Sequence, residues 1–293
     1  MRPPAVDTLK RVVNRHEEIV LYELETLAPE YKYRVYTKIR LADIFNLQRR
    51  SVPPALFSFA LKGHFDFVVC NTDHKPLFAV EFDGNLHRKP EQKTRDAKKD
   101  ELCSTFEFPI LRLNSNHIVR QYNGASILRW IVSVWELQKE FCEGQERGTI
   151  PPTEDFDPFW VFHPGSTLEE RHPHWISLRG TLCMERLYKE GKVKYPVSSG
   201  AMGIDGSGNY RGIEYIKVDN ERVICVESAM RQQNFPIYFG DLFDELMRIL
   251  LFDKLKRFVE TGEGASAIAE VRSRLRDHQK DYGHARAHSC GTL

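Results

Sequence analysis

Two short apolar runs separated by a polar loop constrain the fold of this chain more than any other feature. The runs are HFDFVVC at residues 64–70 and LFAVEFD at residues 77–83, and the loop between them reads NTDHKP. Apolar runs of this length bounded by turn formers are typical of strands, so the sequence predicts a β-hairpin. One face is expected to carry Phe65, Phe67, Val69, Phe78, Val80 and Phe82, and the other Val68, Cys70, Leu77 and Ala79. Two apolar faces require helices on both sides of the sheet.

Four polar side chains interrupt these runs at one end of the hairpin. Folding about the loop midpoint pairs Cys70 with Leu77, Asp66 with Glu81, and His64 with Asp83. Since side chains alternate between faces with period two, the polar four project from one face. Opposed carboxylates repel each other, and burial adds to that cost. A hard cation such as Mg²⁺ would remove both penalties. The alternative is a solvated polar strand end without a metal.

Composition limits the classes of function that the chain can have. The 293 residues are 41% hydrophobic and 28% charged, and 42 basic against 41 acidic residues give a formal charge of +1. Overall charge therefore gives no support to binding of a polyanion, and any nucleic-acid contact must be local. The six cysteines form no CxxC pair, which indicates reduced thiols in a cytoplasm. The chain shows no signal-peptide core and no apolar run of about 20 residues, so we expect no membrane segment.

The first half predicts a single α/β domain over residues 8–145. Helical spacing predicts a helix at 8–28 ended by Pro29, and β-forming residues predict a strand at 34–41. Residues 43–62 are interpreted as a loop. After the hairpin, a helix at 90–106, a strand at 108–113 and a helix at 124–143 follow. This order predicts an α/β/α sandwich with a central mixed four-stranded sheet.

The second half is expected to be an α+β accessory domain over residues 159–283, after a proline-rich linker at 144–158. It is expected to contain a hairpin at 215–227 and helices at 241–260 and 265–282, with a flexible tail at 284–293. The glycine-rich residues 200–212 are interpreted as a flexible loop, because they lack the GK[ST] of a phosphate loop. His163, His172 and His174 are interpreted as part of an aromatic loop and not as a metal site.

A dense polar segment, EFDGNLHRKPEQKTRDAKKDEL, begins at Glu81. A sharp turn at Gly84 would bring His87 back towards the carboxylates. Gln92, Asp96 and Lys99 are spaced by four and three residues, so they share one helix face. If that face looks towards the strand end, Lys99 offers a cation beside a reacting phosphate.

At these residues the chain resembles the PD-(D/E)XK nuclease superfamily, and within it a bacterial domain family of unknown function. The resemblance spans about residues 10–120, through Glu18 before Leu21 and Tyr22, then GHFDFVVC, EFDGNLH, RDAKKD and ILRL. It implies a restriction-endonuclease-like fold in which Asp66 and Glu81 hold Mg²⁺ or Mn²⁺, with Glu18 beside them. Similarity to short-patch-repair endonucleases adds His87. We count Asp83 as a further candidate ligand, and His64, Gln92 and Asp96 as supporting residues.

One departure from the superfamily pattern concerns a lysine that usually stands two residues after the acidic strand residue. Asp83 occupies that position here. Three interpretations remain open: Lys99 supplies the lysine from the helix, catalysis depends on the metal and His87, or the chemistry is lost.

The sequence thus predicts a metal-dependent endonuclease that hydrolyses phosphodiester bonds, in DNA ahead of RNA. Phosphate contacts are expected from the basic residues Arg88, Lys89, Lys93, Arg95 and Lys98. The alternative for these residues is a solvated helix face. A rival function is an inactive nuclease fold that binds nucleic acid or a protein, and a third is a subunit active only in a complex. Residues 159–283 are a candidate surface for a homodimer or a partner protein.

Overall fold

The computed structural model describes residues 10–48, 52–83, 90–114, 116–122, 124–282 and 286–288. The chain divides into two compact units, which we call the first and the second unit. The first unit takes in Met1–Phe156 and Gln233–Ile237, and the second Asp157–Gln232 and Tyr238–Leu293. A short segment from late in the sequence therefore belongs to the first unit.

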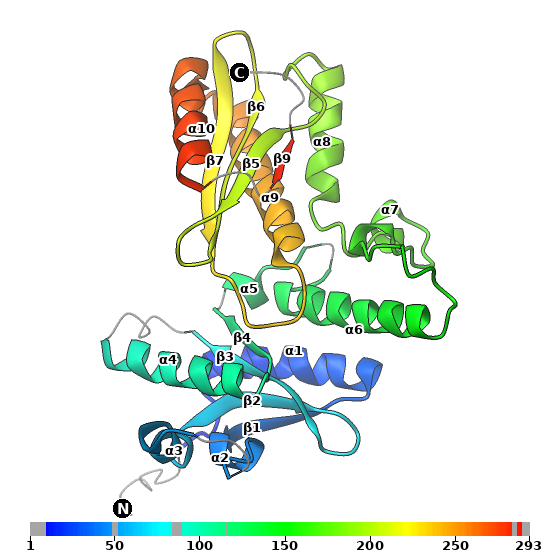
Figure 1. Ribbon diagram of the computed structural model, residues 1–293. Coiled ribbons are helices and arrows are strands. Elements are labelled where there is room, and N and C mark those ends of the chain that lie inside the picture. Colours follow the sequence, from blue (N-terminus) through cyan, green and yellow to red (C-terminus); the bar gives the residue numbers. More distant parts are fainter. Residues whose placement is uncertain are drawn as a thin grey trace, which may run out of the picture. The chain divides into compact units, whose positions relative to one another are not determined.

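The first unit is a mixed α/β structure with one four-stranded sheet in the order β1-β2-β3-β4 (Figure 1). Strands β1, β2 and β3 are antiparallel neighbours, whereas β3 and β4 are parallel and are joined through helix α4. The elements in chain order are α1 (Arg15–Tyr31), β1 (Arg34–Arg40), α2 (Leu41–Ile44), α3 (Pro54–Ala60), β2 (His64–Cys70), β3 (Pro76–Phe82), α4 (Pro90–Thr105), β4 (Ile110–Leu113), α5 (Asn116–Val119) and α6 (Ile127–Glu146). The mixed four-stranded sheet and the strand, helix, strand crossover agree with the prediction.

The register of the hairpin differs from the prediction at its turn. Phe67 pairs with Val80, Val68 with Ala79 and Val69 with Phe78, as expected, but Cys70 pairs with Pro76 and not with Leu77. The register shifts between Val69 and Cys70, because the loop closes through its own hydrogen bonds. Asn71 accepts the backbone N–H groups of Asp73 and Lys75 with its side chain, and His74 has a positive φ of 62°.

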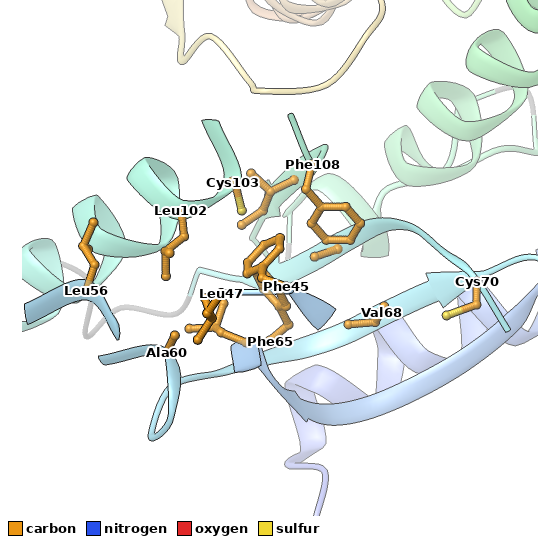
Figure 2. Packing of buried hydrophobic residues seen from close by; sticks show 13 residues of the cluster. Phe45, Leu47, Leu56, Ala60, Phe65, Val68, Cys70, Leu102, Cys103 and Phe108 are labelled. Carbon is orange, nitrogen blue, oxygen red and sulfur yellow. The ribbon is translucent and has the colours of Figure 1, made fainter. Parts of the chain in front are cut away.

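One face of the sheet packs against α2, α3 and α4. Figure 2 shows Leu102 and Cys103 reaching from α4 towards the sheet, where Phe65 and Val68 lie in the same buried cluster. The prediction placed Phe65 on the opposite face, and this was wrong. The break in the alternation of side chains coincides with an irregular backbone in the neighbouring strand, because Lys38 of β1 has a φ of 53° between the pairs Thr37↔Phe67 and Ile39↔Phe65.

The other face of the sheet is covered by α6, by Tyr33 just before β1 and by Phe235 of the late segment. Phe78 of β3 contacts the rings of Tyr33, Trp135 and Phe235 edge to face. Phe235 lies in the late segment, where Asn234 accepts the N–H of Ile110 and extends the edge of β4. Aromatic side chains at this contact fill the core on the α6 side.

The first helix and the predicted loop also differ from the sequence prediction. Helix α1 begins after Asn14, whose side chain caps it, and contains Pro29 instead of ending there. It ends where Lys32 adopts a left-handed conformation. The predicted loop at 43–62 contains α2 and α3, and Pro54 fits the first turn of α3 because that position needs no N–H donor. Arg49 and Arg50 lie outside the described residues.

The second unit contains an antiparallel five-stranded sheet in the order β8-β7-β6-β5-β9. Its elements are the 3₁₀ helix η2 (Pro158–Trp160), then α7 (Leu168–Arg171), α8 (Leu178–Lys189), β5 (Ser199–Ile204), β6 (Tyr210–Lys217), β7 (Arg222–Met230), α9 (Phe239–Thr261), β8 (Ser266–Ala267), α10 (Ile268–Tyr282) and β9 (Arg286–His288). Among the described helices of both units, none has the length and apolar composition needed to cross a bilayer.

Two predictions for the second unit were wrong. The glycine-rich residues 200–212 form most of β5 and the start of β6. Their glycines serve close packing, because a Cβ on Gly200 would lie 2.6 Å from the Ile213 carbonyl oxygen and one on Gly212 would lie 2.8 Å from the Phe243 ring. Residues 286–288, assigned to a flexible tail, form β9 and pair with β5.

Replacement of Phe235 tests whether the late segment is part of the core of the first unit. Phe235 is 6% exposed, and Phe235→Ala should lower the free energy of unfolding by about 3–5 kcal/mol, as for other large buried aromatic residues. Urea denaturation measures this loss. Tyr22→Ala is the matched control, because Tyr22 is 70% exposed and should change stability by about 0.5 kcal/mol at most. If the two substitutions lower the free energy of unfolding equally, the late segment is not part of the core of the first unit.

Candidate functional site

Asp66 of β2 and Glu81 of β3 lie together at the end of the hairpin. The backbone N–H of Asp66 donates to Glu81 Oε1 at 3.3 Å, and the N–H of Phe82 donates to Asp66 Oδ2 at 3.0 Å. Each carboxyl group is therefore held by the backbone of the opposite strand. The glutamate side chain is buried, with 3% exposed, and the aspartate side chain is 15% exposed.

Two lysines from distant elements neutralise the two carboxylates. Lys38 Nζ lies 2.6 Å from Asp66 Oδ1 and 2.9 Å from Glu17 Oε1. Lys99 Nζ lies 2.6 Å from Glu81 Oε2, and its side chain is 7% exposed. The sequence offered Lys99 as a cation here only if its helix face met the strand end, and the structure fulfils that condition. It missed Lys38. The available signal was a charged residue inside the strand RVYTKIR.

The surroundings of the two carboxyl groups move their pKa values in opposite directions. Burial alone would raise the pKa of Asp66, but the hydrogen bonds from Lys38 and from the Phe82 N–H outweigh it and lower that pKa. Burial raises the pKa of Glu81 to about 7, against the opposing charge of Lys99. Neighbouring acids with separated pKa values are typical of sites that bind metals or transfer protons.

A third cation, Arg112 of β4, stands beside Glu81 in the sheet. Its side chain is 3% exposed, and its guanidinium lies 2.8 Å from Asp100 Oδ1, 3.5 Å from Asp96 Oδ1 and 3.9 Å from Asp83 Oδ1. Gln92 donates to the same Asp96 oxygen at 3.0 Å. The sequence missed this arginine too, although a charged residue in the buried run ILRL was the signal.

The helix α1 contributes Glu17 to the site, whereas the resemblance implied Glu18. Glu18 bonds to Arg11, and both of these side chains are 60% exposed. Glu17 bonds to Lys38 and also closes the cap of α1 with Asn14. Successive helix residues point about 100° apart, so an error of one residue moves the side chain from the site to solvent.

The remaining predicted residues differ in how exposed they are, and three of them lie outside the described residues. His64 is partly buried, and burial together with the charges of Lys38 and Lys99 lowers its pKa. Lys93 and Arg95 are exposed on α4. Lys98 is partly buried, with its Nζ 5.7 Å from the centroid of the Phe59 ring. The predicted residues His87, Arg88 and Lys89 lie outside the described residues.

We call the nine linked charged side chains the polar cluster. Its members are Glu17, Lys38, Asp66, Glu81, Asp83, Asp96, Lys99, Asp100 and Arg112. Six carboxylates and three cations give these nine side chains a formal charge of −3 when all are ionised. Such a cluster attracts a cation, and binding would stabilise the charged form of Glu81.

The donor set of the polar cluster fits a hard divalent ion. Among the residues that the structure describes, no three His, Cys, Asp or Glu side chains converge as a preformed metal cage. Mg²⁺ usually takes one or two carboxylates and completes its shell with water and substrate phosphates, so it needs no such cage. Asp66 and Glu81, one from each strand, match this kind of coordination.

Residues 9–126 match the model of a family described as a protein of unknown function (DUF2726). The matched stretch contains all nine residues of the polar cluster. Searches of curated proteins and of solved structures gave no match.

Removal of Lys99 should destabilise the protein more at pH 8 than at pH 5. The raised pKa of Glu81 means that protonation favours the folded state, a contribution that is full below pH 4.5 and lost as the pH rises through about 7. In Lys99→Met the carboxylate loses its cation, so at pH 8 we expect a loss of about 3–5 kcal/mol, as for other broken buried ion pairs. At pH 5 the neutral carboxyl group should reduce this loss. Urea denaturation at both pH values measures it.

Two controls accompany this measurement. Lys93→Met changes an exposed lysine on the same helix and should have little effect at either pH. The double variant Glu81→Gln, Lys99→Met removes the buried charge and should lose the extra sensitivity at pH 8. If Lys99→Met loses the same stability at both pH values, the buried ion pair is not the cause.

Proposed function

We propose that the first unit is a metal-dependent nuclease that hydrolyses phosphodiester bonds, in DNA ahead of RNA. The observation that carries this proposal is the proximity of Asp66 and Glu81 on adjacent strands, with a lysine amine 2.6 Å from each. Two carboxylates can bind Mg²⁺ or Mn²⁺, and a lysine can contact a phosphate. Both functions assist the hydrolysis of a phosphodiester bond, because each neutralises charge that develops on the phosphate.

The fold supports the same proposal. A mixed four-stranded sheet with a parallel β3-α4-β4 crossover is compatible with a restriction-endonuclease-like α/β/α sandwich. In that interpretation Asp66 and Glu81 occupy the acidic positions of the PD-(D/E)XK pattern. Fold similarity alone does not assign chemistry, so the proposal depends on the side chains of the polar cluster.

The contact of Lys99 with Glu81 supports one of the three interpretations of the missing strand lysine. Asp83 holds the usual lysine position, and its carboxylate lies 3.9 Å from Arg112. Lys99 reaches Glu81 from α4 instead. A lysine supplied by the helix can therefore replace one supplied by the strand.

Five residues of the polar cluster have parts in the proposed mechanism. Asp66 and Glu81 would hold the ion, which would lower the pKa of bound water and neutralise charge on the phosphate. Lys99 carries three N–H donors and would orient a water molecule or a phosphate oxygen. Lys38 fixes the orientation of Asp66, because the same ammonium also bonds to Glu17.

Basic residues on α4 are the proposed contacts to the nucleic-acid backbone. Asp96 and Asp100 contact the buried Arg112, so part of the acidic charge of the helix is directed inward. Lys93 and Arg95 are exposed and could bind phosphates without reading sequence. Arg88, Lys89 and Lys98 belong to the same proposal.

A rival function is an inactive nuclease fold that binds nucleic acid or a protein partner. The observation that favours it is the neutralisation of both carboxylates by protein lysines, together with Asp83 in place of the usual lysine. We further propose a cytoplasmic location, since the five described cysteines are free thiols. A homodimer or partner surface within residues 159–283 is part of the same proposal.

Cleavage assays test the nuclease function directly. Purified protein with Mg²⁺ or Mn²⁺ should cleave DNA, and Asp66→Asn or Glu81→Gln should each reduce the rate at least about 100-fold, since each removes a metal ligand. Glu18→Gln is the matched control, because Glu18 is an exposed neighbour of the site. Binding of a DNA strand without cleavage by the wild type would favour the rival. Cleavage that survives both substitutions would contradict the assignment.

Metal binding should be linked to release of a proton from Glu81. Because the pKa of Glu81 is about 7, the ion competes with a proton below that pH. The affinity for Mn²⁺ should therefore rise roughly tenfold per pH unit up to about pH 7 and then level off. Isothermal titration calorimetry in buffers of different ionisation enthalpy measures both effects. Glu81→Gln should bind the ion more weakly and without this proton release, whereas an unchanged pH dependence would exclude Glu81 as the linked group.

A further inference from the structure

A cavity of about 620 Å³ lies in the second unit and is lined by residues of η2, α8 and α9. Its volume is in the range of pockets that bind small ligands, about 300–1,000 Å³. Five ring-bearing side chains line it: Phe159, Trp160, Phe162, His172 and Trp175. None of these residues has a part in the proposed chemistry of the polar cluster.

Two of these rings are far more exposed than large aromatic side chains usually are. Trp160 is 73% exposed and Phe162 is 61% exposed. Their ring centroids lie 6.4 Å apart in an edge-to-face arrangement, and Phe162 also contacts the His172 ring edge to face at 4.9 Å. Neighbouring exposed rings beside a cavity provide stacking surfaces for a planar ligand.

The polar groups of the lining can both donate and accept hydrogen bonds. The hydroxyl of Thr181 donates to the Ser177 carbonyl, and the hydroxyl of Ser198 donates to Glu214, so each oxygen has lone pairs for a donor on a ligand. Arg248 lines the same cavity, and its guanidinium has more N–H groups than the one donated to Glu245 at 2.7 Å. A ligand with donors and acceptors on one edge matches this wall.

The charges of the lining favour a neutral ligand. Glu245 is 1% exposed and pairs with Arg248, and burial raises the pKa of Glu245 to about 7. Asp157, the other acid of the lining, accepts the Phe159 N–H. Both acids of the lining are thus already bonded within the protein, and a cationic ligand would depend on the ring faces. A purely apolar ligand would leave the polar groups without partners at a cost in free energy.

We propose that this cavity binds a nucleobase, stacked on the face of Trp160 with Phe162 edge-on against it, and with its edge hydrogen-bonded to Thr181, Ser198 and Arg248. The base can come from a single strand or from a free nucleoside. The choice of a strand as the source rests on the proposed nuclease function. Stacking accepts any base, because each has a π face, so this contact would hold a strand without strong sequence preference.

Binding without cleavage tests this proposal separately from the nuclease function. The full chain in EDTA is titrated with adenosine, with uridine, and with short oligo(dT), oligo(dA) and duplex DNA, while tryptophan fluorescence is recorded. We expect saturable quenching by bases, and Trp160→Ala or Phe162→Ala should weaken affinity roughly 10- to 100-fold, the usual effect of a lost stacking contact. Both positions are exposed, so the variants should keep the wild-type thermal unfolding curve.

Two matched variants distinguish base binding in the cavity from cleavage at the polar cluster. Tyr188→Ala removes a 45% exposed aromatic residue of α8 outside the cavity lining and should leave base binding unchanged. Glu81→Gln should lose cleavage in the magnesium assay but keep base binding in EDTA, so failure of the nuclease proposal would appear only in the first assay. Competition of free nucleosides with oligonucleotides would identify the source of the base.

Three results would overturn the proposal. One is the absence of saturable binding by every nucleoside and single strand. Another is unchanged affinity in both Trp160→Ala and Phe162→Ala. The third is binding of tetramethylammonium in place of nucleosides, which would identify the cavity as a cation site.

Discussion

Burial of Glu81 is the constraint on which the site in the first unit depends. A carboxylate with 3% of its side chain exposed is costly to ionise unless cations stand next to it. Lys99 from α4 and Arg112 from β4 supply that charge, and Arg112 in turn bonds to Asp100 of α4. The position of α4 against the sheet is therefore coupled to the protonation state of a single buried side chain.

The backbone of β1 is adapted to the same cluster. Lys38 is a non-glycine residue with a left-handed φ of 53° inside a strand, a conformation that costs about 1–2 kcal/mol. Its ammonium bonds to both Asp66 and Glu17, and these two ion pairs offset the cost. Phe65, which lies opposite Ile39 in the same pair of strands, is in the core against α4. Backbone strain and ion pairing thus meet at Lys38.

The two units have different chemical character. The polar cluster of the first unit has six carboxylates and suits a divalent cation, whereas the cavity of the second unit is rich in aromatic rings and suits a planar neutral ligand. A metal centre and a base-binding pocket recognise different parts of a nucleotide, its phosphate and its base. Under the proposed function, the first unit would carry the chemistry and the second would add affinity for the substrate.

The sequence by itself determined the hairpin, the meeting of Asp66 and Glu81, and the shared helix face of Gln92, Asp96 and Lys99, because these follow from local periodicity in strands and helices. Only the packing of α4 decided that this face meets the strand end. Only the tertiary structure decided the partners that complete the site. Lys38 and Arg112 come from other strands, and the rotation of α1 about its axis places Glu17, and not Glu18, at the site. The tertiary structure also brought Phe235 to the core from a segment far along the chain. Periodicity fixes which residues share a face, but it does not fix which distant elements pack against that face.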